Sequence, residues 1–344
     1  MRDLDHRQGD IAKFWEEPMF KTLAASAAMM TIACSFAGAT ELRLSHQFST
    51  NDVRHRIAQM VADDVAAANV DLTIKIFPSA SLFKASEQYV PLSRGQLDMT
   101  VFPLSYAGGQ RAEYNLTLMP GLIKDHDHAA RMNDSPFMDA IEEVMAQDDV
   151  KVLVHGYLAG GFASKEGCIT RPEHMKGKTV RAAGKAFEQM LEGAGASISS
   201  MPSSDAYNGM QQGIIDALNT SSSSFVSFRI YEQVGCYTPA GDVALWFMYQ
   251  PLLINKSTFE ELTPEQQEAL TTASAKAQAY YLEEAKKEDA ASIEPFEKAG
   301  VEIARMTPED FAEWRKLAEE TSYKAFLEEV PDGQRFLDLA AQVE

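Results

Sequence analysis

The sequence predicts an α/β protein built as two lobes, and three observations support that fold class. Strand-like segments alternate with helical ones as far as Asn255, which is typical of parallel-type sheets flanked by helices. The remaining quarter of the chain is helical. The length of 344 residues, of which 45% are hydrophobic, exceeds what a single core usually serves. No flexible linker separates the lobes, so we expect strands to join them and to act as a hinge.

The first lobe begins with a β-loop-α unit. Residues 42–44 alternate as a strand does, residues 46–50 are typical of a loop, and residues 53–65 repeat Val and Ile at helical spacing. Further strands, separated by helical or loop segments, are predicted at residues 71–77, 98–102, 150–155, 179–182, 214–217 and 252–255.

Helix start signals dominate the C-terminal quarter. Thr263 and Thr307 each precede a proline, the pattern of a capped helix with proline at its first position. Between these caps, residues 269–294 are rich in Ala, Glu, Lys and Gln and predict one long helix. A helix of that length can brace two lobes.

The N-terminal segment has the features of an export signal. Lys21 precedes an uncharged run at residues 23–36, and Ala37-Gly38-Ala39 then matches a small-residue cleavage site. We expect residues 19–39 to be a signal peptide that is cleaved after Ala39. A membrane anchor is the alternative, although the run is shorter than the ~20 residues that a spanning helix needs.

Residues 1–18 do not fit such a signal. They carry five acidic groups, which are unwelcome ahead of an apolar signal segment. We interpret them as an over-long start-codon assignment, with Met19 as the true start. A lipoprotein signal through Cys34 is disfavoured, because Thr31 stands where a branched apolar residue is wanted.

Composition limits the partners and the redox chemistry. The formal charge of −19, from 50 acidic and 31 basic residues, makes nucleic acid and anionic lipid poor partners. The same field repels an anionic small molecule, so a carboxylate ligand would need a specific local cation. After cleavage, Cys168 and Cys236 remain. An oxidising compartment permits a disulfide between them, and two buried free thiols are the alternative.

Signatures of catalysis and of metal binding are absent or weak. No G-x-S-x-G, H-E-x-x-H, Walker A or G-x-G-x-x-G motif occurs. The nearest metal-like cluster, residues 125–128, is expected to be a polar loop ahead of a helix, because nothing fixes a third and fourth ligand. We therefore predict no cofactor and no metal site.

The middle of the chain carries the most specific signal, in segments 156–162, 171–181, 193–196, 201–207 and 209–216. In this order and spacing they resemble the substrate-binding subunits of tripartite ATP-independent periplasmic (TRAP) transporters. The resemblance runs from Leu42 to about Ala325, and residues 118–122 look like the Leu-Pro turn of that family.

The resemblance implies a two-lobed, periplasmic-binding-protein-like α/β fold with crossing hinge strands and a long C-terminal bracing helix. We expect residues 40–157 and 245–285 to form lobe I, and residues 158–244 and 286–344 to form lobe II with the C-terminal helices. The lobes are expected to close over an organic acid and to deliver it to an ion-driven membrane permease. The chain itself would be a monomeric, periplasmic, non-enzymatic binding protein.

Two other functions could use the same cleft. A periplasmic hydrolase or isomerase acting on a small carboxylate would deplete its ligand, whereas a binding protein returns it unchanged. A ligand-sensing partner of a membrane sensor would differ in the downstream protein that it contacts.

The resemblance also suggests ligand contacts. Arg181 matches the carboxylate-binding arginine of the family, and a guanidinium offers parallel N–H donors that stay charged when desolvated. Ala163 stands where many members carry a second arginine, which argues against a dicarboxylate or sialic-acid-like ligand. One arginine with nearby rings would suit an aromatic carboxylate such as a hydroxybenzoate. The other candidate ligand contacts are Asn219, His46, Glu87, Phe102, Tyr106, Tyr157 and Trp246.

Overall fold

The computed structural model describes residues 39–241 and 244–344. Apart from Ala39, the predicted signal peptide at residues 19–39 and the over-extension at residues 1–18 lie outside the described residues. Within the described ranges, no helix is both long enough and apolar enough to cross a membrane.

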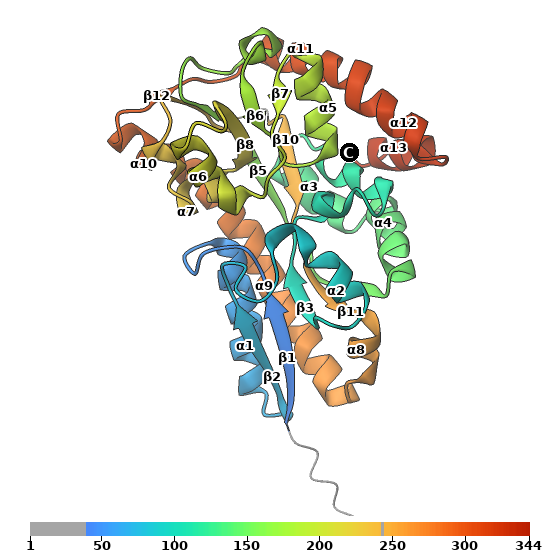
Figure 1. Cartoon of the computed structure of the whole chain (residues 1–344). Helices are drawn as coiled ribbons and strands as arrows, with labels where there is room; N and C mark the ends of the chain where they lie inside the picture. Colours follow the sequence, from blue (N-terminus) through green and yellow to red (C-terminus); the bar gives the residue numbers. More distant parts are fainter. Residues whose placement is uncertain (1–38, 242–243) are drawn as a thin grey trace, which may run out of the picture. The chain divides into compact units, whose positions relative to one another are not determined.

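A five-stranded sheet forms the centre of one lobe (Figure 1). β1 runs parallel to β2 and β3, whereas β11 runs antiparallel to β3 and β4. Helix α1 (Val53–Ala67) packs on α9 (Pro264–Ala291), and both close the core that contains Leu42, Leu44 and Ile57. The strands, in sheet order, are β2 (Leu72–Phe77), β1 (Thr40–Ser45), β3 (Met99–Val101), β11 (Leu252–Asn255) and β4 (Val150–Val154).

A second sheet forms the centre of the other lobe. β5 is its longest strand and pairs antiparallel with β8, β9 and β10, while β6 runs parallel to β7 and β8. The strands are β12 (Glu302–Ile303), β9 (Cys236–Thr238), β5 (Tyr157–Ser164), β8 (Ala217–Ser221), β6 (Thr179–Arg181) and β7 (Ser197–Ile198), with β10 (Trp246–Tyr249) added on β5.

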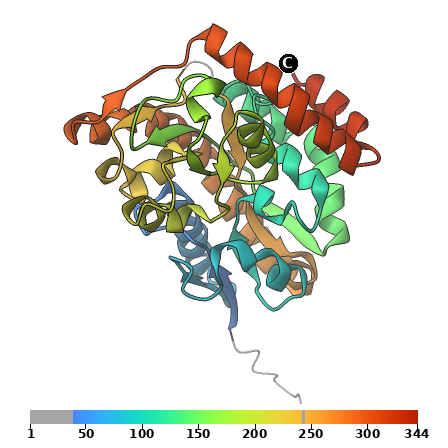
Figure 2. The same ribbon diagram turned by 45° about the horizontal axis from the view of Figure 1, so that its top comes forward.

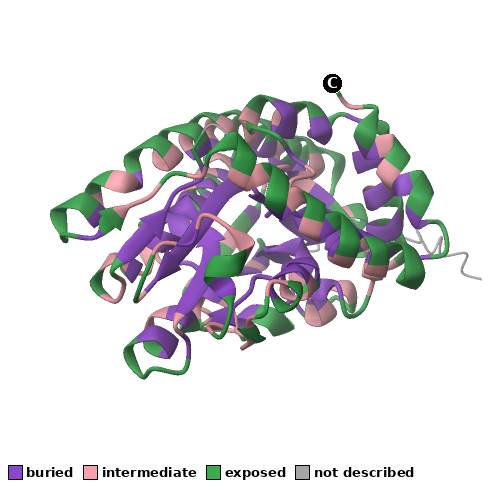
Figure 3. Ribbon diagram, turned by 90° about the horizontal axis from the view of Figure 1, so that it is seen from above, coloured by how far each residue is buried: buried purple, intermediate pink, exposed green. Residues whose placement is uncertain are grey.

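The remaining helices cover these sheets, so that the buried strands lie inside and the exposed helix faces outside (Figure 3). The C-terminal helices lie together in Figure 2, where α11 packs on α5 and α13 packs on α4. The helices are α2 (Tyr89–Ser93), α3 (His126–Asn133), α4 (Pro136–Gln147), α5 (Lys185–Gly193), α6 (Ala206–Gln211), α7 (Ser222–Ser227), α8 (Lys256–Glu261), α10 (Ile293–Lys298), α11 (Pro308–Ala318), α12 (Lys324–Glu329) and α13 (Gly333–Ala341). Shorter helical turns are η1 (Ala85–Glu87), η2 (Leu104–Ala107), η3 (Ala112–Leu118), η4 (Pro172–Met175), η5 (Ser203–Asp205), η6 (Ile230–Glu232) and the π-helical η7 (Glu319–Tyr323).

Two strand-to-strand crossings join the lobes, as predicted. The chain passes from β4 to β5 through Gly156, and it returns from β10 to β11 through Gln250. The Gln250 N–H donates to the Gly156 carbonyl at 2.8 Å, so the two crossings are hydrogen-bonded to each other. A Cβ on Gly156 would lie 1.9 Å from the ring of Tyr281 on α9. The long helix therefore packs directly on the hinge, and only glycine fits beneath it.

The bracing helix α9 is confirmed, with different ends from those predicted. It has 28 residues and begins at Pro264, because Thr263 and Gln266 form a capping box. The predicted helix at residues 269–294 ran past its end, since Ser292 separates α9 from α10. Thr307 caps α11 in the same way as Thr263 caps α9.

The second lobe differs from its predicted pattern at one strand and settles the state of the cysteines. The expected strand at residues 214–217 starts only at Ala217, and Ile214 is 51% exposed in the turn after α6. Cys168 and Cys236 form a disulfide with their Cα atoms 5.2 Å apart. The bridge ties the loop after β5 to β9, so the alternative of two free thiols does not hold.

Candidate functional site

A small cavity lies beside the return crossing, between the two sheets. Its volume is about 170 Å³, and the elements around it come from both sheets. Three residues predicted from the sequence, Arg181, Tyr106 and Trp246, meet on it. The full lining is Arg54, Pro103, Tyr106, Arg181, Ala183, Ser203, Thr220, Ser224, Trp246, Met248 and Gln250.

Arg181, the last residue of β6, is completely buried at this cavity. Its Nε donates to the carbonyl of Met201 at 2.8 Å, and its Nη1 donates to the carbonyl of Asn219 at 2.7 Å. Its Nη2 donates to the hydroxyl of Tyr106 at 2.7 Å. A guanidinium has five N–H donors, so one on each terminal nitrogen is left without a protein partner. In the described part of the chain, no carboxylate pairs with this guanidinium.

Tyr106 ties the loop after β3 to Arg181. Its hydroxyl accepts from Arg181 and from the backbone N–H of Ser203, the latter at 3.1 Å. Burial alone would raise the pKa of this phenol, but the Arg181 guanidinium and the hydrogen bonds from Ser203 outweigh burial and lower the pKa. The ring packs edge-on against Phe102, with the centroids 6.1 Å apart.

Arg54 is a second buried guanidinium on the cavity, and the sequence analysis missed it. It lies in the first turn of α1 and contacts Asp52, the residue that caps this helix. Arg54 Nε and Nη2 donate to the two oxygens of Asp52 at 2.7 and 2.6 Å. Nη1 donates to Gln250 at 2.7 Å, and Nη2 also donates to Ser224 at 2.9 Å.

One sequence signal could have drawn attention to Arg54. A cation in the first turn of a helix opposes the helix dipole, so an arginine there without an exposed face is unusual. The guanidinium also stacks 3.7 Å above the ring of Phe48. The second cation therefore comes from α1, while Ala163 is packed in β5 between Leu218 and Tyr237.

Two predicted residues near the cavity have polar atoms without partners. The indole Nε1 of Trp246, which lines the cavity, has no hydrogen-bond partner, and its side chain is buried. Both polar atoms of the Asn219 side-chain amide are also buried and unpartnered. Asn219 is not among the lining residues, and its contact with the site is through its carbonyl to Arg181. Buried polar groups are nearly always paired, so these atoms are candidates for ligand contact.

The other four predicted residues lie away from the cavity lining. His46 is buried and hydrogen-bonds His55 at 3.1 Å, and burial is the main cause that lowers its pKa to about 3. Glu87 is largely exposed and pairs with Lys84 at 3.3 Å. Phe102 packs between Tyr89 and Tyr106. Tyr157 packs on Tyr249, with the centroids 4.9 Å apart, at the start of β5. These contacts support the walls of the site.

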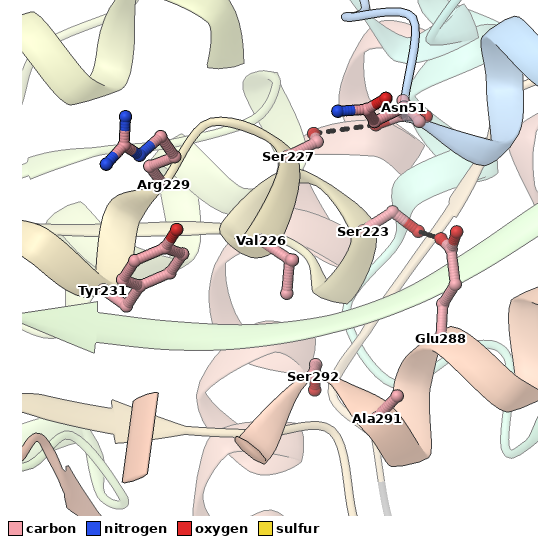
Figure 4. Close-up of a pocket in the computed structure, with 10 residues that line it drawn as sticks. Asn51, Ser223, Val226, Ser227, Arg229, Tyr231, Glu288, Ala291 and Ser292 are labelled. Carbon is pink, nitrogen blue, oxygen red and sulfur yellow. Dashed lines mark hydrogen bonds between the residues drawn. The ribbon is translucent and has the colours of Figure 1, made fainter. Parts of the chain in front are cut away.

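Two larger cavities lie nearby and have different chemistry. One, of about 870 Å³, lies on the other side of Asp52, and Figure 4 shows Ser223 donating to Glu288 at its edge. Its lining cation, Arg229, is exposed and pairs with Glu232. The other, of about 930 Å³, shares Tyr106 with the small cavity and is more open. It provides a path from solvent toward Arg181.

The residues that could have held a metal are engaged otherwise. Within residues 39–241 and 244–344, one group of ligand-type atoms is clustered, and it consists of the two disulfide cysteines with Glu302. In the segment at residues 125–128, Asp125 caps α3, His126 contacts Asp289, and Asp127 pairs with Lys286. These side chains do not converge on one point.

Two sheets joined by crossing strands, with a buried arginine between them, define a two-lobed solute-binding protein. The sequence matches the family described as bacterial extracellular solute-binding protein, family 7 (DctP), over residues 44–329, and the chain belongs to this family. It is a periplasmic binding protein of the TRAP type and not an enzyme, as the sequence predicted.

Its relatives cover nearly the whole chain. A solute-binding protein of Albidiferax ferrireducens is 32% identical over 323 residues, 92% of this chain and 96% of the relative. The TRAP periplasmic solute-binding protein of Rhodoferax ferrireducens, solved with bound malonate, is 32% identical, with a TM-score of 0.85 over 88% of this chain and 98% of that chain. The 2,3-diketo-L-gulonate-binding periplasmic protein of Escherichia coli is 25% identical over 332 residues, 92% of this chain and 96% of the relative.

Proposed function

We propose that this protein captures a short organic carboxylate in the 170 Å³ cavity and that Arg181 binds the carboxylate group. One observation carries the proposal: Arg181 is completely buried, yet all its protein partners are uncharged oxygens. Burying a charge is costly unless the charge is paired. Its two uncommitted N–H groups suit the two oxygens of a carboxylate.

The volume of the cavity supports a ligand of few atoms. Pockets for drug-sized molecules measure roughly 300–1,000 Å³, well above 170 Å³. The malonate bound by the relative from Rhodoferax ferrireducens is such a small acid. The aromatic carboxylate considered from the sequence is less well supported, because Phe102 and Tyr157 do not line the cavity.

Closure of the two lobes would prepare the protein for its membrane partner. Tyr106 and Arg54 reach the cavity from elements beside the first sheet, while Arg181 and Trp246 belong to the second. A ligand held by both sets would stabilise the closed form. The family implies that the closed, monomeric protein delivers the acid to the permease subunits of a TRAP transporter.

A thermal-shift screen of the protein against mono-, di- and aromatic carboxylates tests this function. A ligand at a hundred times its Kd should stabilise the protein by about 2.7 kcal/mol. We expect short acids to give the largest shifts and Arg181→Ala to abolish them. Equal shifts of Arg181→Ala and wild type with the best ligand would show that the acid binds elsewhere.

A further inference from the structure

We propose that the cavity selects a ligand carrying one negative charge, with a neutral polar group at its other end, because Asp52 already neutralises Arg54. This inference rests on the proposed function, since it takes Arg181 as the carboxylate site. It goes beyond that function by assigning the charge of the substrate and naming Asp52 as the residue that sets it.

The charges around the cavity leave one cation unpaired. Arg54 and Arg181 are the charged side chains that line it, and Asp52 pairs with Arg54 at 2.6 Å. The next cation along α1, Arg56, pairs with Glu288 at 2.6 Å and with Glu284 at 3.5 Å. Arg181 alone therefore supplies a net positive charge to the ligand.

The nearby histidines add no positive charge near neutral pH. His46 and His55 lie behind Arg54, on the side of Phe48, and contact each other at 3.1 Å. Burial is the largest cause that lowers the pKa of both rings. Neutral rings leave the charge count at the cavity unchanged.

Asp52 is held too firmly to give way to a second ligand carboxylate. Its side-chain oxygens accept from the backbone N–H of Arg54 at 3.0 Å, from the Arg54 guanidinium, and from the Ser227 hydroxyl at 2.8 Å. Burial would raise the pKa of Asp52, but Arg54 outweighs burial and the pKa is lowered. A second ligand carboxylate would thus meet an arginine that already has a buried counter-charge.

The remaining lining suits a neutral oxygen function. The unpartnered indole N–H of Trp246 can donate one hydrogen bond to a ligand oxygen. Ser203, Thr220, Ser224 and Gln250 add uncharged polar groups around it. An amide, oxo or hydroxy group on a short monocarboxylate would fit this lining without adding charge.

Calorimetric titration of the wild-type protein with malonate and with its monoamide, malonamate, tests the inference. The two acids have the same number of heavy atoms and differ by one charge at pH 8. We expect malonamate to bind more tightly, by about tenfold or more, because an unpaired buried charge is costly. Tighter binding of malonate would overturn the charge inference and leave the proposed carboxylate site standing. Failure of both acids and of every other carboxylate to bind would overturn both proposals.

Substitutions at the pair show which residue sets the preference. Asp52→Asn keeps a helix-capping side chain and removes the counter-charge, so the ratio of malonate to malonamate affinity should rise about tenfold or more. The double variant Asp52→Asn with Arg54→Gln restores the original net charge, and the ratio should return to that of wild type. An unchanged ratio in folded Asp52→Asn would overturn the role of Asp52. If that variant does not fold, the wild-type comparison decides by itself.

Discussion

Two arginines are buried within one small cavity, and their surroundings differ in a single respect. Arg54 has a carboxylate from its own chain, Asp52, whereas Arg181 has only two carbonyls and a phenol. The first guanidinium is satisfied by the fold, and the second is complete only when an anion arrives. The difference teaches that burial alone does not mark a ligand-binding arginine; the absence of an internal counter-charge does.

The largest expected effect comes from breaking the satisfied pair. Arg54→Met leaves Asp52 buried without its cation, which should lower the free energy of unfolding by about 3–5 kcal/mol. Urea denaturation would measure the loss. The double variant with Asp52→Asn should recover much of it, because no buried charge is then left unpaired. A loss below about 1 kcal/mol would mean that the pair is not the structural element we describe.

The matched change on the other side should act mainly on binding. Arg181→Met removes the proposed carboxylate anchor, and the cost of about 2–5 kcal/mol corresponds to a loss of roughly 30-fold or more in affinity. Its unfolding free energy should fall less than that of Arg54→Met, since no carboxylate is left behind. Calorimetric titration and urea denaturation of the two variants, run in parallel, would reveal a reversed pattern if the assignment is wrong.

Acid should weaken the structural side of the comparison. His46 stacks on Phe48, whose other contact is Arg54, and burial lowers the pKa of His46 to about 3. The unfolded chain has a histidine pKa of about 6.5, so it binds more protons than the folded chain between about pH 3 and 6.5. Stability is therefore lost as the pH falls through this window.

The size of this acid effect can be isolated with one variant. At pH 5 the His46 contribution should amount to about 2 kcal/mol. His46→Gln should flatten this part of the pH dependence of unfolding, although other buried histidines still contribute. Identical pH profiles for wild type and His46→Gln would show that His46 is not the group responsible.

The smallest expected effect concerns the unpartnered indole. Trp246→Phe removes one N–H donor from the cavity, and a hydrogen bond of about 0.5–1.5 kcal/mol corresponds to a weakening of roughly two- to tenfold. Tyr157→Phe is the matched control, because its hydroxyl is also unpartnered but lies off the cavity lining. Equal effects of the two variants on affinity would remove Trp246 from the site.

The fold was predictable where periodicity and caps are local. The alternation of strands and helices, the capped starts at Thr263 and Thr307, and a long bracing helix are all present. Strand β5 was not identifiable by pattern, because a Cβ at Gly160 or Gly161 would lie 1.9 Å from the carbonyl of Thr220 or Thr238. Close packing between strands demands glycine there and removes the hydrophobic alternation that marks a strand.

The site was predictable only in part. The resemblance pointed to Arg181, and the structure places Tyr106 and Trp246 on the same cavity. Arg54 was missed because its burial depends on Gln250 and Ser224, which are 196 and 170 residues away in the sequence. A local Asp-x-Arg pattern at a helix start does not reveal such distant partners.

A crystal structure of the protein with a bound short carboxylate tests the central claim most directly. We predict that the carboxylate oxygens lie about 2.7–2.9 Å from Nη1 and Nη2 of Arg181, with the Arg54–Asp52 pair intact. A carboxylate bound to Arg54 in place of Asp52, or one that makes no contact with Arg181, would contradict the account.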